Sequence, residues 1–449
     1  MTKQTDSREI ALDILMEILE RGSYSHVVLR QALEKYQYLE KQDRAFITRV
    51  TEGTIEYLLA IDAILDGCSR VKIKKMKPLI RTLLRMSVYQ IGWMDRIPDS
   101  AVCNEAVKLA AKRRFAGLKG FVNGVLRSVA RQKEEDGGFS FEDWSLKYSM
   151  PQWLIDRWCK DLPRETVEQM LAAFLEDTPT TVRCNLDKAD KAAILESLRG
   201  QDVLVEESPL SETALLLKSY DYLEGLEAFC KGWIQVQDVS SGFVGEIAAP
   251  RPGANVLDVC GAPGGKSLHI ADILKGTGLV TVRDLTEAKI RMVEDNIARA
   301  GFTNMRAEVW DALEFDESWE NQADIVIADL PCSGLGIIGK KPDIKYQVTE
   351  TGLHELAELQ REILSVVSRY VKPGGKLIYS TCTVNRQENE EQAAWFATRF
   401  PFVPVNIEGM LGGAIREESM KNGYLQLLPG RYPCDGFFIA AFLKEEGAS

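Results

Sequence analysis

The C-terminal half of the chain alternates short apolar segments with helix-like segments, and this alternation restricts the possible folds more than any other feature. The apolar segments predict strands at 255–260, 278–284, 305–311, 324–330, 376–382 and 437–443. Helical patterns separate them near 265–275, 286–300, 352–371 and 386–399. Alternating β and α units are typical of a parallel, doubly wound sheet with helices on both faces. We therefore expect a Rossmann-like α/β domain over residues 236–449.

The first part of the chain has helical periodicity and no alternation of period two. Asp6 and Ser7 can cap a first helix, and Gly22 can end it. Further helices are expected near 26–36, 43–68, 77–94, 100–113 and 118–132. The polar segment 133–138 predicts a linker. We therefore expect an all-α domain over residues 1–138.

Residues 139–235 give mixed signals. Helical stretches there are combined with strand-like segments at 180–186 and 202–207, so we expect a small α+β module. A chain of 449 residues is long enough for these three domains.

Composition restricts the compartment and the kind of partner. No run of about 18 apolar residues exists, and the N-terminus has no secretory pattern, so we expect a cytoplasmic protein without a membrane segment. The nine cysteines are scattered without a CxxC pair, and the three histidines lack ligand spacing, so no metal is expected. The net charge is −11, yet residues 1–150 carry +5, so a nucleic-acid contact should be local.

The loop after the first predicted strand of the α/β domain has the composition of a ligand site. In an open α/β sheet, ligands bind at the carboxyl ends of the strands. Small residues let a ligand approach the backbone, and the next helix offers free N–H groups to an anion. The glycine spacing fits neither GxGxxG nor GxxxxGK[ST], which disfavours a phosphate cradle. The loop residues are Cys260, Gly261, Ala262, Pro263, Gly264, Gly265 and Lys266.

Acidic residues end the next two strands. Asp284 lies 26 positions after Asp258, which suits a carboxylate that binds a ribose diol; the alternative is a helix N-cap near Thr286. Asp311 is placed for an adenine amino group, with an exposed loop acid as the alternative. A glycine turn followed by two strand-end acids favours a nucleoside pocket.

Two cysteines follow the fourth and fifth strands of this domain. Cys332 lies in the segment 329–334 and Cys382 in 380–383, 50 positions apart, and both should face one edge of the sheet. A single cysteine there would more often be a buried apolar residue. Two at ligand-binding strand ends favour chemistry instead, because a thiolate near positive charge is a strong nucleophile, and Lys266 can supply that charge.

These motifs resemble those of the RNA cytosine-C5 methyltransferases. The matching segments in the α/β domain are CGAPGGKS at 260–267, DLPCSG at 329–334, KKPDI at 340–344, STCT at 380–383 and DGFF at 435–438. The N-terminal domain is similar to NusB, an RNA-binding helical fold, through NEAV at 104–107 and FVNGVL at 121–126. This combination points to the branch of the family that modifies bacterial 16S ribosomal RNA.

The resemblance implies a class I methyltransferase domain that uses S-adenosylmethionine, held by the loop 260–266 together with Asp284, Asp311 and Asp329. It implies that Cys382 adds to cytosine C6 and that Cys332 assists release. The implied partner is 16S ribosomal RNA, and we expect a monomer. Gly261, Leu330 and Thr383 depart from the family pattern without affecting this chemistry.

RNA contacts are indicated by two basic clusters and, more loosely, by Arg183 and Asn185. The clusters are Lys72, Lys74, Lys75, Lys77, Arg81 and Arg85, and Lys112, Arg113, Arg114 and Lys119. Solvated helix faces are the alternative explanation of such runs. Other hypotheses for the whole chain are a transfer-RNA cytosine methyltransferase and a non-catalytic RNA-binding assembly factor. An NAD-dependent oxidoreductase is disfavoured by the glycine spacing.

Overall fold

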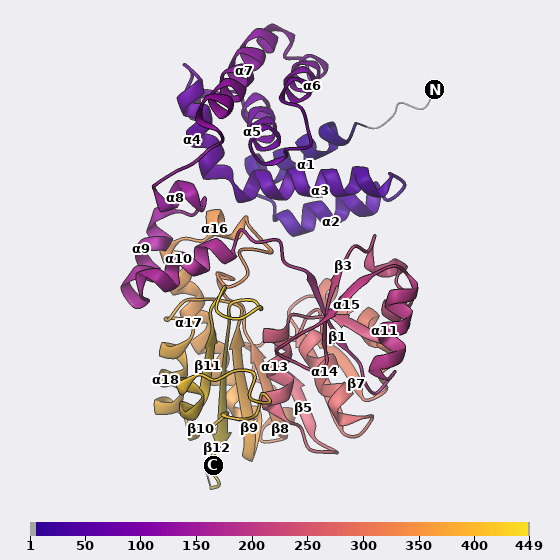
Figure 1. Ribbon diagram of the computed structural model, residues 1–449. Helices are drawn as coiled ribbons and strands as arrows, with labels where there is room; N and C mark the ends of the chain where they lie inside the picture. Colours follow the sequence, from indigo (N-terminus) through magenta and orange to yellow (C-terminus); the bar gives the residue numbers. More distant parts are fainter. Residues whose placement is uncertain (1–5, 448–449) are drawn as a thin grey trace. The chain divides into compact units, whose positions relative to one another are not determined.

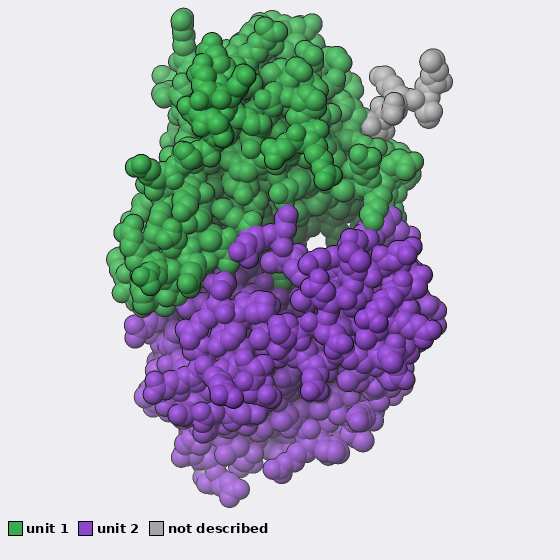
Figure 2. Space-filling view, viewed as in Figure 1, with its two compact units in different colours: residues 1–175, 338–347 green, residues 176–337, 348–449 purple. Residues whose placement is uncertain are grey.

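The computed structural model describes residues 6–447, which form two compact units. The first unit consists of the residues up to Leu175 together with the segment Ile338–Gln347. The second unit consists of Glu176–Ile337 and the residues from Val348 onward (Figure 2). A division into three folding domains, 1–138, 139–235 and 236–449, remains our proposal. Within residues 6–447, no helix combines the length and apolar character needed to cross a membrane.

The first unit is helical, as predicted. Asp6 caps its first helix by accepting a hydrogen bond from Arg8 N (3.0 Å), and Gly22 ends that helix with a positive φ of 78°. The α-helices are α1 (Ser7–Arg21), α2 (Ser25–Lys35), α3 (Lys41–Glu56), α4 (Leu58–Cys68), α5 (Pro78–Trp93), α6 (Asp99–Lys112), α7 (Lys119–Asp136), α8 (Trp144–Lys147), α9 (Gln152–Asp161), α10 (Arg164–Ala173) and α16 (Ile344–Gln347).

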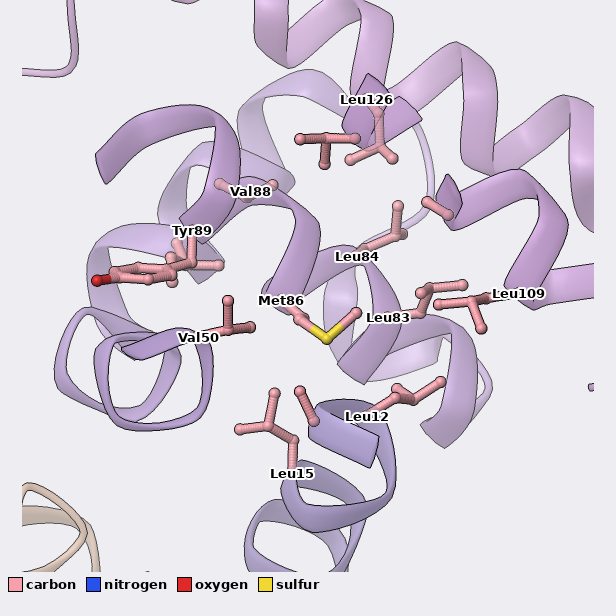
Figure 3. Close-up of a cluster of buried hydrophobic side chains, with 14 of the residues drawn as sticks. Leu12, Leu15, Val50, Leu83, Leu84, Met86, Val88, Tyr89, Leu109 and Leu126 are labelled. Atoms are coloured by element: carbon pink, nitrogen blue, oxygen red, sulfur yellow. The ribbon is translucent and has the colours of Figure 1, made fainter. Parts of the chain in front are cut away.

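The core of this unit is built on α5. Its side chains Leu83, Leu84, Met86 and Val88 are buried among apolar residues of α1, α3, α6 and α7 (Figure 3). The predicted single helix 43–68 was wrong, because the chain leaves helical geometry at Tyr57. The Tyr57 ring stacks on Trp93, with ring centroids 4.6 Å apart, so tertiary packing outweighs local helix propensity.

A segment from the C-terminal half of the chain, Ile338–Gln347, belongs to the first unit. The Asp343 carboxylate accepts hydrogen bonds from the backbone N–H (3.0 Å) and hydroxyl of Ser25. The buried Lys345 side chain donates from Nζ to Glu56 O at the C-terminus of α3 (2.8 Å), and burial lowers the pKa of its amine to about 7. These contacts explain the KKPDI segment as a packing element of the helical unit.

The second unit begins with a small antiparallel sheet of order β2-β3-β1-β4, accompanied by two helices, as expected for an α+β module. Strand β3 and strand β4 were not predicted. The elements are β1 (Thr180–Cys184), α11 (Lys191–Gly200), β2 (Leu204–Glu207), β3 (Ala214–Lys218), α12 (Glu227–Cys230) and β4 (Ile234–Val236).

The large sheet of the second unit has the order β10-β12-β9-β8-β5-β6-β7, with β11 paired to β12 (Figure 1). Its strands are β5 (Asn255–Asp258), β6 (Leu279–Asp284), β7 (Met305–Val309), β8 (Ala323–Asp329), β9 (Val371–Thr381), β10 (Phe402–Pro404), β11 (Tyr424–Leu427) and β12 (Phe437–Lys444). Its helices are α13 (Val239–Ala248), α14 (Gly265–Leu274), α15 (Glu287–Ala300), α17 (Glu350–Val367) and α18 (Glu390–Arg399).

Both faces of this sheet are covered, as the doubly wound prediction requires. Alternate residues of β8 belong to two different apolar clusters. Ile325 and Ile327 pack in one cluster, and Val326 and Ala328 pack in the other. The sheet is not entirely parallel, however, because β12 runs antiparallel to β9, β10 and β11. Antiparallel neighbours need no helical crossover, and no α-helix separates β11 from β12.

The order of the strands locates the ligand edge. From β5 the chain continues through β6 to β7 on one side of the sheet, and it then returns to form β8 and β9 on the other side of β5. The strand order therefore reverses between β5 and β8. Ligands of open α/β sheets bind beside such a reversal, outside the carboxyl ends of the strands. Strands β5, β6, β8 and β9 run parallel, which brings their carboxyl ends to one edge.

Candidate active site

The loop after β5 is shaped by two glycines. A Cβ at Gly261 would lie 2.5 Å from Val282 Cγ1 and 2.8 Å from Asp258 Cγ, so only glycine fits there without displacement. Gly264 has a φ of +104° and accepts no side chain without strain. Helix α14 starts at Gly265, so its first N–H groups are free to meet an anionic group. The loop therefore presents backbone to a ligand.

Asp284 faces this loop. Its carboxylate accepts hydrogen bonds from Ala262 N (3.1 Å) and Leu285 N (2.8 Å), and it forms an ion pair with Lys289 (2.9 Å). The N-cap of α15 is Thr286, whose hydroxyl accepts from Lys289 N, so Asp284 does not serve as the cap. The capping alternative is excluded, and the buried carboxylate remains next to the glycine loop.

Asp311 is half-buried and lies beyond the end of β7 at Val309. Its carboxylate accepts a hydrogen bond from Leu313 N (3.0 Å). This is the local turn contact of a loop acid. Asp284 thus lies against the loop, and the hydrogen bond that Asp311 accepts is within its own turn.

Asp258, at the end of β5, is fully buried under the loop. It accepts a hydrogen bond from Ser267 Oγ (2.5 Å), which joins the strand end to α14. Burial raises the pKa of Asp258 to about 7, partly offset by the Ser267 hydrogen bond. A buried carboxylate below a glycine-rich turn is a supporting group that the sequence pattern did not single out.

Lys266 and Asp329 form an ion pair at the reversal between β5 and β8. The Nζ–Oδ2 distance is 2.6 Å, and Ser380 Oγ donates to Asp329 Oδ1 (2.7 Å). Burial by itself would lower the pKa of Lys266, but the Asp329 charge and hydrogen bond outweigh it and raise that pKa. A cation is therefore maintained beside the ends of β8 and β9.

The two predicted cysteines converge. The sulfurs of Cys332 and Cys382 are 3.4 Å apart, within hydrogen-bonding distance for thiols, and both residues are partly exposed. The hydrogen bond to Cys382 and the loss of bulk water raise the pKa of the Cys332 thiol well above its ordinary range, with further contributions from Glu388 and Asp329. Lys266, in contrast, interacts electrostatically with Cys382. A thiolate at Cys332 is therefore disfavoured.

Backbone contacts hold the two cysteine loops together. Gly336 N donates to Cys382 O (3.1 Å), and Gly436 N donates to Gly336 O (3.0 Å). A Cβ at Gly336 would lie 2.0 Å from Gly436 O, so this close approach requires glycine. It explains the glycine of the DGFF segment, while Phe437 places its ring 5.2 Å from Lys266 Nζ.

A buried polar cluster next to the cysteine loops was not predicted from the sequence. Glu388 and Gln360 are fully buried, and their hydrogen bonds reach Ser333 and Pro331 on either side of Cys332. Glu388 follows Cys382 by six positions in a polar loop. Nothing in that spacing predicts burial of its carboxylate.

The two predicted RNA-binding clusters differ in their contacts. Four of their residues form ion pairs with acidic residues of the first unit. The pairs are Arg81–Glu20, Arg85–Asp62, Lys112–Glu9 and Arg113–Asp13. Lys74, Lys75 and Lys77 are exposed, whereas Ile73 and Met76 between them are buried and fix the segment. The part of the first cluster around 74–77 is thus an accessible basic surface, and Arg114 and Lys119 of the second cluster are exposed as well.

Arg183 and Asn185 are not surface residues. Arg183 is 2% exposed; it donates to Gln237 Oε1 (2.8 Å) and lies 3.4 Å from Asp272 Oδ2. Asn185 donates to Gly232 O (2.5 Å). Their expected RNA contact is wrong, because both side chains are buried within the second unit.

Comparisons with known proteins match the whole chain. Family models described as "16S rRNA methyltransferase RsmB/F", "NusB family" and an RsmF/B-like ferredoxin-like domain match residues 246–443, 5–131 and 150–221. A Bacillus subtilis protein named "Probable ribosomal RNA small subunit methyltransferase B" is 37% identical over 99% of this chain and 100% of its own length. A Shewanella oneidensis protein named "Ribosomal RNA small subunit methyltransferase B" is 30% identical over 97% and 99%.

Solved structures show the same arrangement of elements. The structure of PH0851 has a TM-score of 0.82 and 26% identity, covering 98% of this chain and 99% of its own. A structure titled as a methyltransferase homolog protein from Pyrococcus horikoshii has a TM-score of 0.58 and 25% identity, covering 67% and 98%. The first of these similarities extends over both units.

Proposed function

The chain belongs to the RsmB/F family of 16S rRNA methyltransferases, and we propose that it methylates C5 of a cytosine in small-subunit ribosomal RNA. The observation that carries this proposal is the pair of partly exposed sulfurs, Cys332 and Cys382, 3.4 Å apart at the ligand edge of the sheet. We assign the nucleophile to Cys382 and the release step to Cys332. The NusB-like helical unit supports an RNA substrate, and we propose that the protein acts as a monomer.

The residues around the β5 loop fit S-adenosylmethionine. The requirement for glycine at Gly261 and the free N–H groups at the start of α14 suit a ligand that lies against the backbone with an anionic end. We propose that residues 260–266, Asp284, Asp311 and Asp329 hold this cofactor. When bound, S-adenosylmethionine supplies an electrophilic methyl group.

Attack by a sulfur explains how an unreactive carbon is methylated. Cytosine C5 is a poor nucleophile while the ring is aromatic. The Cys382 thiolate adds to C6, and the new C6–S bond leaves electron density on C5, which then takes the methyl group. The Asp329 carboxylate can accept a hydrogen bond from the cytosine N3/N4 edge, with Lys266 and Ser380 fixing its two oxygens. The cytosine must first leave its stack to reach these groups.

Release of the product needs a base that takes the proton from C5. The Cys332 thiol lies 3.4 Å from the Cys382 sulfur, and its hydrogen bond to Cys382 is the first cause of its raised pKa. Once the Cys382 sulfur is bound to C6 it carries no charge, so Cys332 can give its proton to solvent and act as the base. The Cys332 thiolate takes the C5 proton, the C5–H electron pair forms the C5=C6 double bond, and the C6–S bond breaks with its electrons on Cys382. Cys332 is left as a thiol and Cys382 as a thiolate, ready for the next turnover.

Product analysis tests the proposed substrate and position. The protein is incubated with methyl-labelled S-adenosylmethionine and either unmodified 16S ribosomal RNA or transfer RNA, and the RNA is digested to nucleosides. We expect label in 5-methylcytidine from 16S ribosomal RNA. Label only in transfer RNA would assign the alternative substrate, and no label in any RNA would favour the binding-factor hypothesis.

A further inference from the structure

Glu388 is a buried carboxylate that joins the two loops bearing the sulfurs. Its side chain is fully buried, and the hydrogen bonds that reach its two oxygens are all donated to it. A carboxylate removed from water is costly unless donors surround it. The position of these donors therefore indicates what the carboxylate is for.

The donors come from both sides of the site. Ser333, the neighbour of Cys332, donates its backbone N–H to Glu388 Oε2 (2.9 Å) and its hydroxyl to Oε1 (2.5 Å). Asn385, three positions after Cys382, donates its amide to Oε1 (2.8 Å). The Ser333 hydroxyl also lies 2.6 Å from Thr383 Oγ1. One carboxylate thus fixes the chain next to each sulfur.

A third element anchors this arrangement. Gln360 on α17 is fully buried, and its amide nitrogen donates to Glu388 Oε2 (3.1 Å) and to Pro331 O (2.9 Å). The residues before and after Cys332 are therefore both tied to the same polar cluster. Displacement of Glu388 would remove both hydrogen bonds from Ser333, while the bond from Gln360 to Pro331 O would remain.

Acidic groups act on Cys332. They are Cys382, Glu388 and Asp329, and each of them raises the pKa of the Cys332 thiol. Cys332 also interacts electrostatically with Tyr379. Lys266 is a cation that interacts with Cys382.

We propose that Glu388 is a positioning residue that fixes the Cys332 loop and, through its negative charge near that sulfur, determines which of the two adjacent thiols is the nucleophile. A thiolate at Cys332 is disfavoured by this charge, so the proton of the pair stays on Cys332 and the thiolate forms at Cys382. The assignment of catalytic roles rests on the proposed function; the selectivity between the thiols does not.

Limited alkylation measures this selectivity directly. The full-length protein is treated with substoichiometric iodoacetamide at pH 7, and the ratio of modified Cys382 to modified Cys332 is read by peptide mass spectrometry. We expect modification mainly at Cys382 in the wild type. Glu388→Gln removes the charge with little change in shape, and the ratio should shift toward Cys332 by about threefold or more.

Two further variants separate charge from folding. Glu388→Asp keeps the charge but shortens the reach, so it should retain the wild-type ratio while kcat falls roughly tenfold, because a buried donor is left without its acceptor. Glu391→Gln makes the same chemical change at an exposed position three residues along, and it should alter neither ratio nor kcat. If Glu388→Gln does not fold, Ser333→Ala replaces it: the ratio should stay within twofold while kcat falls.

The proposal is overturned if Glu388→Gln keeps the wild-type ratio, if Glu388→Asp shifts the ratio as much as Glu388→Gln does, or if Ser333→Ala shifts it as strongly. Alkylation requires neither RNA nor S-adenosylmethionine. A wild-type protein that methylates no RNA would therefore refute the proposed function while the alkylation ratio still decides the role of Glu388.

Discussion

Gly261→Ala should weaken S-adenosylmethionine binding, because the added methyl group has no room. Its Cβ would lie 2.5 Å from Val282 Cγ1 and 2.8 Å from Asp258 Cγ, and both of these residues are fully buried in strands of the central sheet. Neither neighbour is the flexible end of a surface side chain. The loop must therefore move away from the end of β5.

The size of the effect follows from the cost of overpacking. Forcing an extra carbon into a packed site typically costs about 1–3 kcal/mol. If the loop shifts to relieve this overlap, S-adenosylmethionine must return it to the binding conformation. The free energy of binding is then reduced by the same amount. The Kd for S-adenosylmethionine should then rise by about 5- to 150-fold, since 1.4 kcal/mol corresponds to a factor of ten.

Calorimetric titration with S-adenosylmethionine measures this change, with thermal unfolding recorded in parallel. The matched control is Gly242→Ala in α13, where a Cβ would meet nothing within 4 Å and the backbone is helical. That change should leave the Kd unaltered and the Tm equal or slightly higher. An affinity of Gly261→Ala equal to that of Gly242→Ala would refute the account of the loop.

Two other predictions concern the accessible basic segment and the buried acid. Replacing Lys74, Lys75 and Lys77 with glutamine should reduce the slope of log K against log salt for 16S ribosomal RNA by about 2, because each phosphate contact contributes about 0.7–0.9. Lys112→Gln, whose lysine is held by Glu9 (2.5 Å), should change it little; equal effects per lysine would contradict the distinction. Burial raises the pKa of Asp258 to about 7, so the folded state binds a proton more tightly than the unfolded state and stability falls from about pH 4 to pH 7. Asp258→Asn should remove that fall, so the Tm of the variant should rise relative to that of the wild type as the pH increases over this interval. A difference in Tm that does not change with pH would contradict the raised pKa of Asp258.

The placement of much of the candidate site was predictable from the sequence, because its residues follow strands. Cys260–Lys266, Asp284, Asp329 and Cys382 each stand at the carboxyl end of a recognisable apolar segment, and parallel strands place those ends at one edge. Local capping preferences left the role of Asp284 open. The structure resolved it, because Thr286 caps α15.

Features that depend on distant contacts were not predictable from local patterns. The pairing of Lys112 with Glu9 joins residues 103 positions apart, so a basic run in the sequence did not show which lysines were accessible. The break at Tyr57 depends on stacking with Trp93, and the burial of Glu388 depends on α17. The antiparallel direction of β12 follows from its connection, which has no periodic signal of its own.

The central claim, covalent catalysis by Cys382 with release by Cys332, is tested most directly by trapping the RNA adduct. Wild type, Cys332→Ala and Cys382→Ala are each incubated with S-adenosylmethionine and unmodified 16S ribosomal RNA, then denatured and separated by electrophoresis. We predict a denaturation-resistant protein–RNA complex in Cys332→Ala, because addition proceeds but release fails, and none in Cys382→Ala. A stable complex in Cys382→Ala, or methylation of cytosine by that variant at the wild-type rate, would contradict the account.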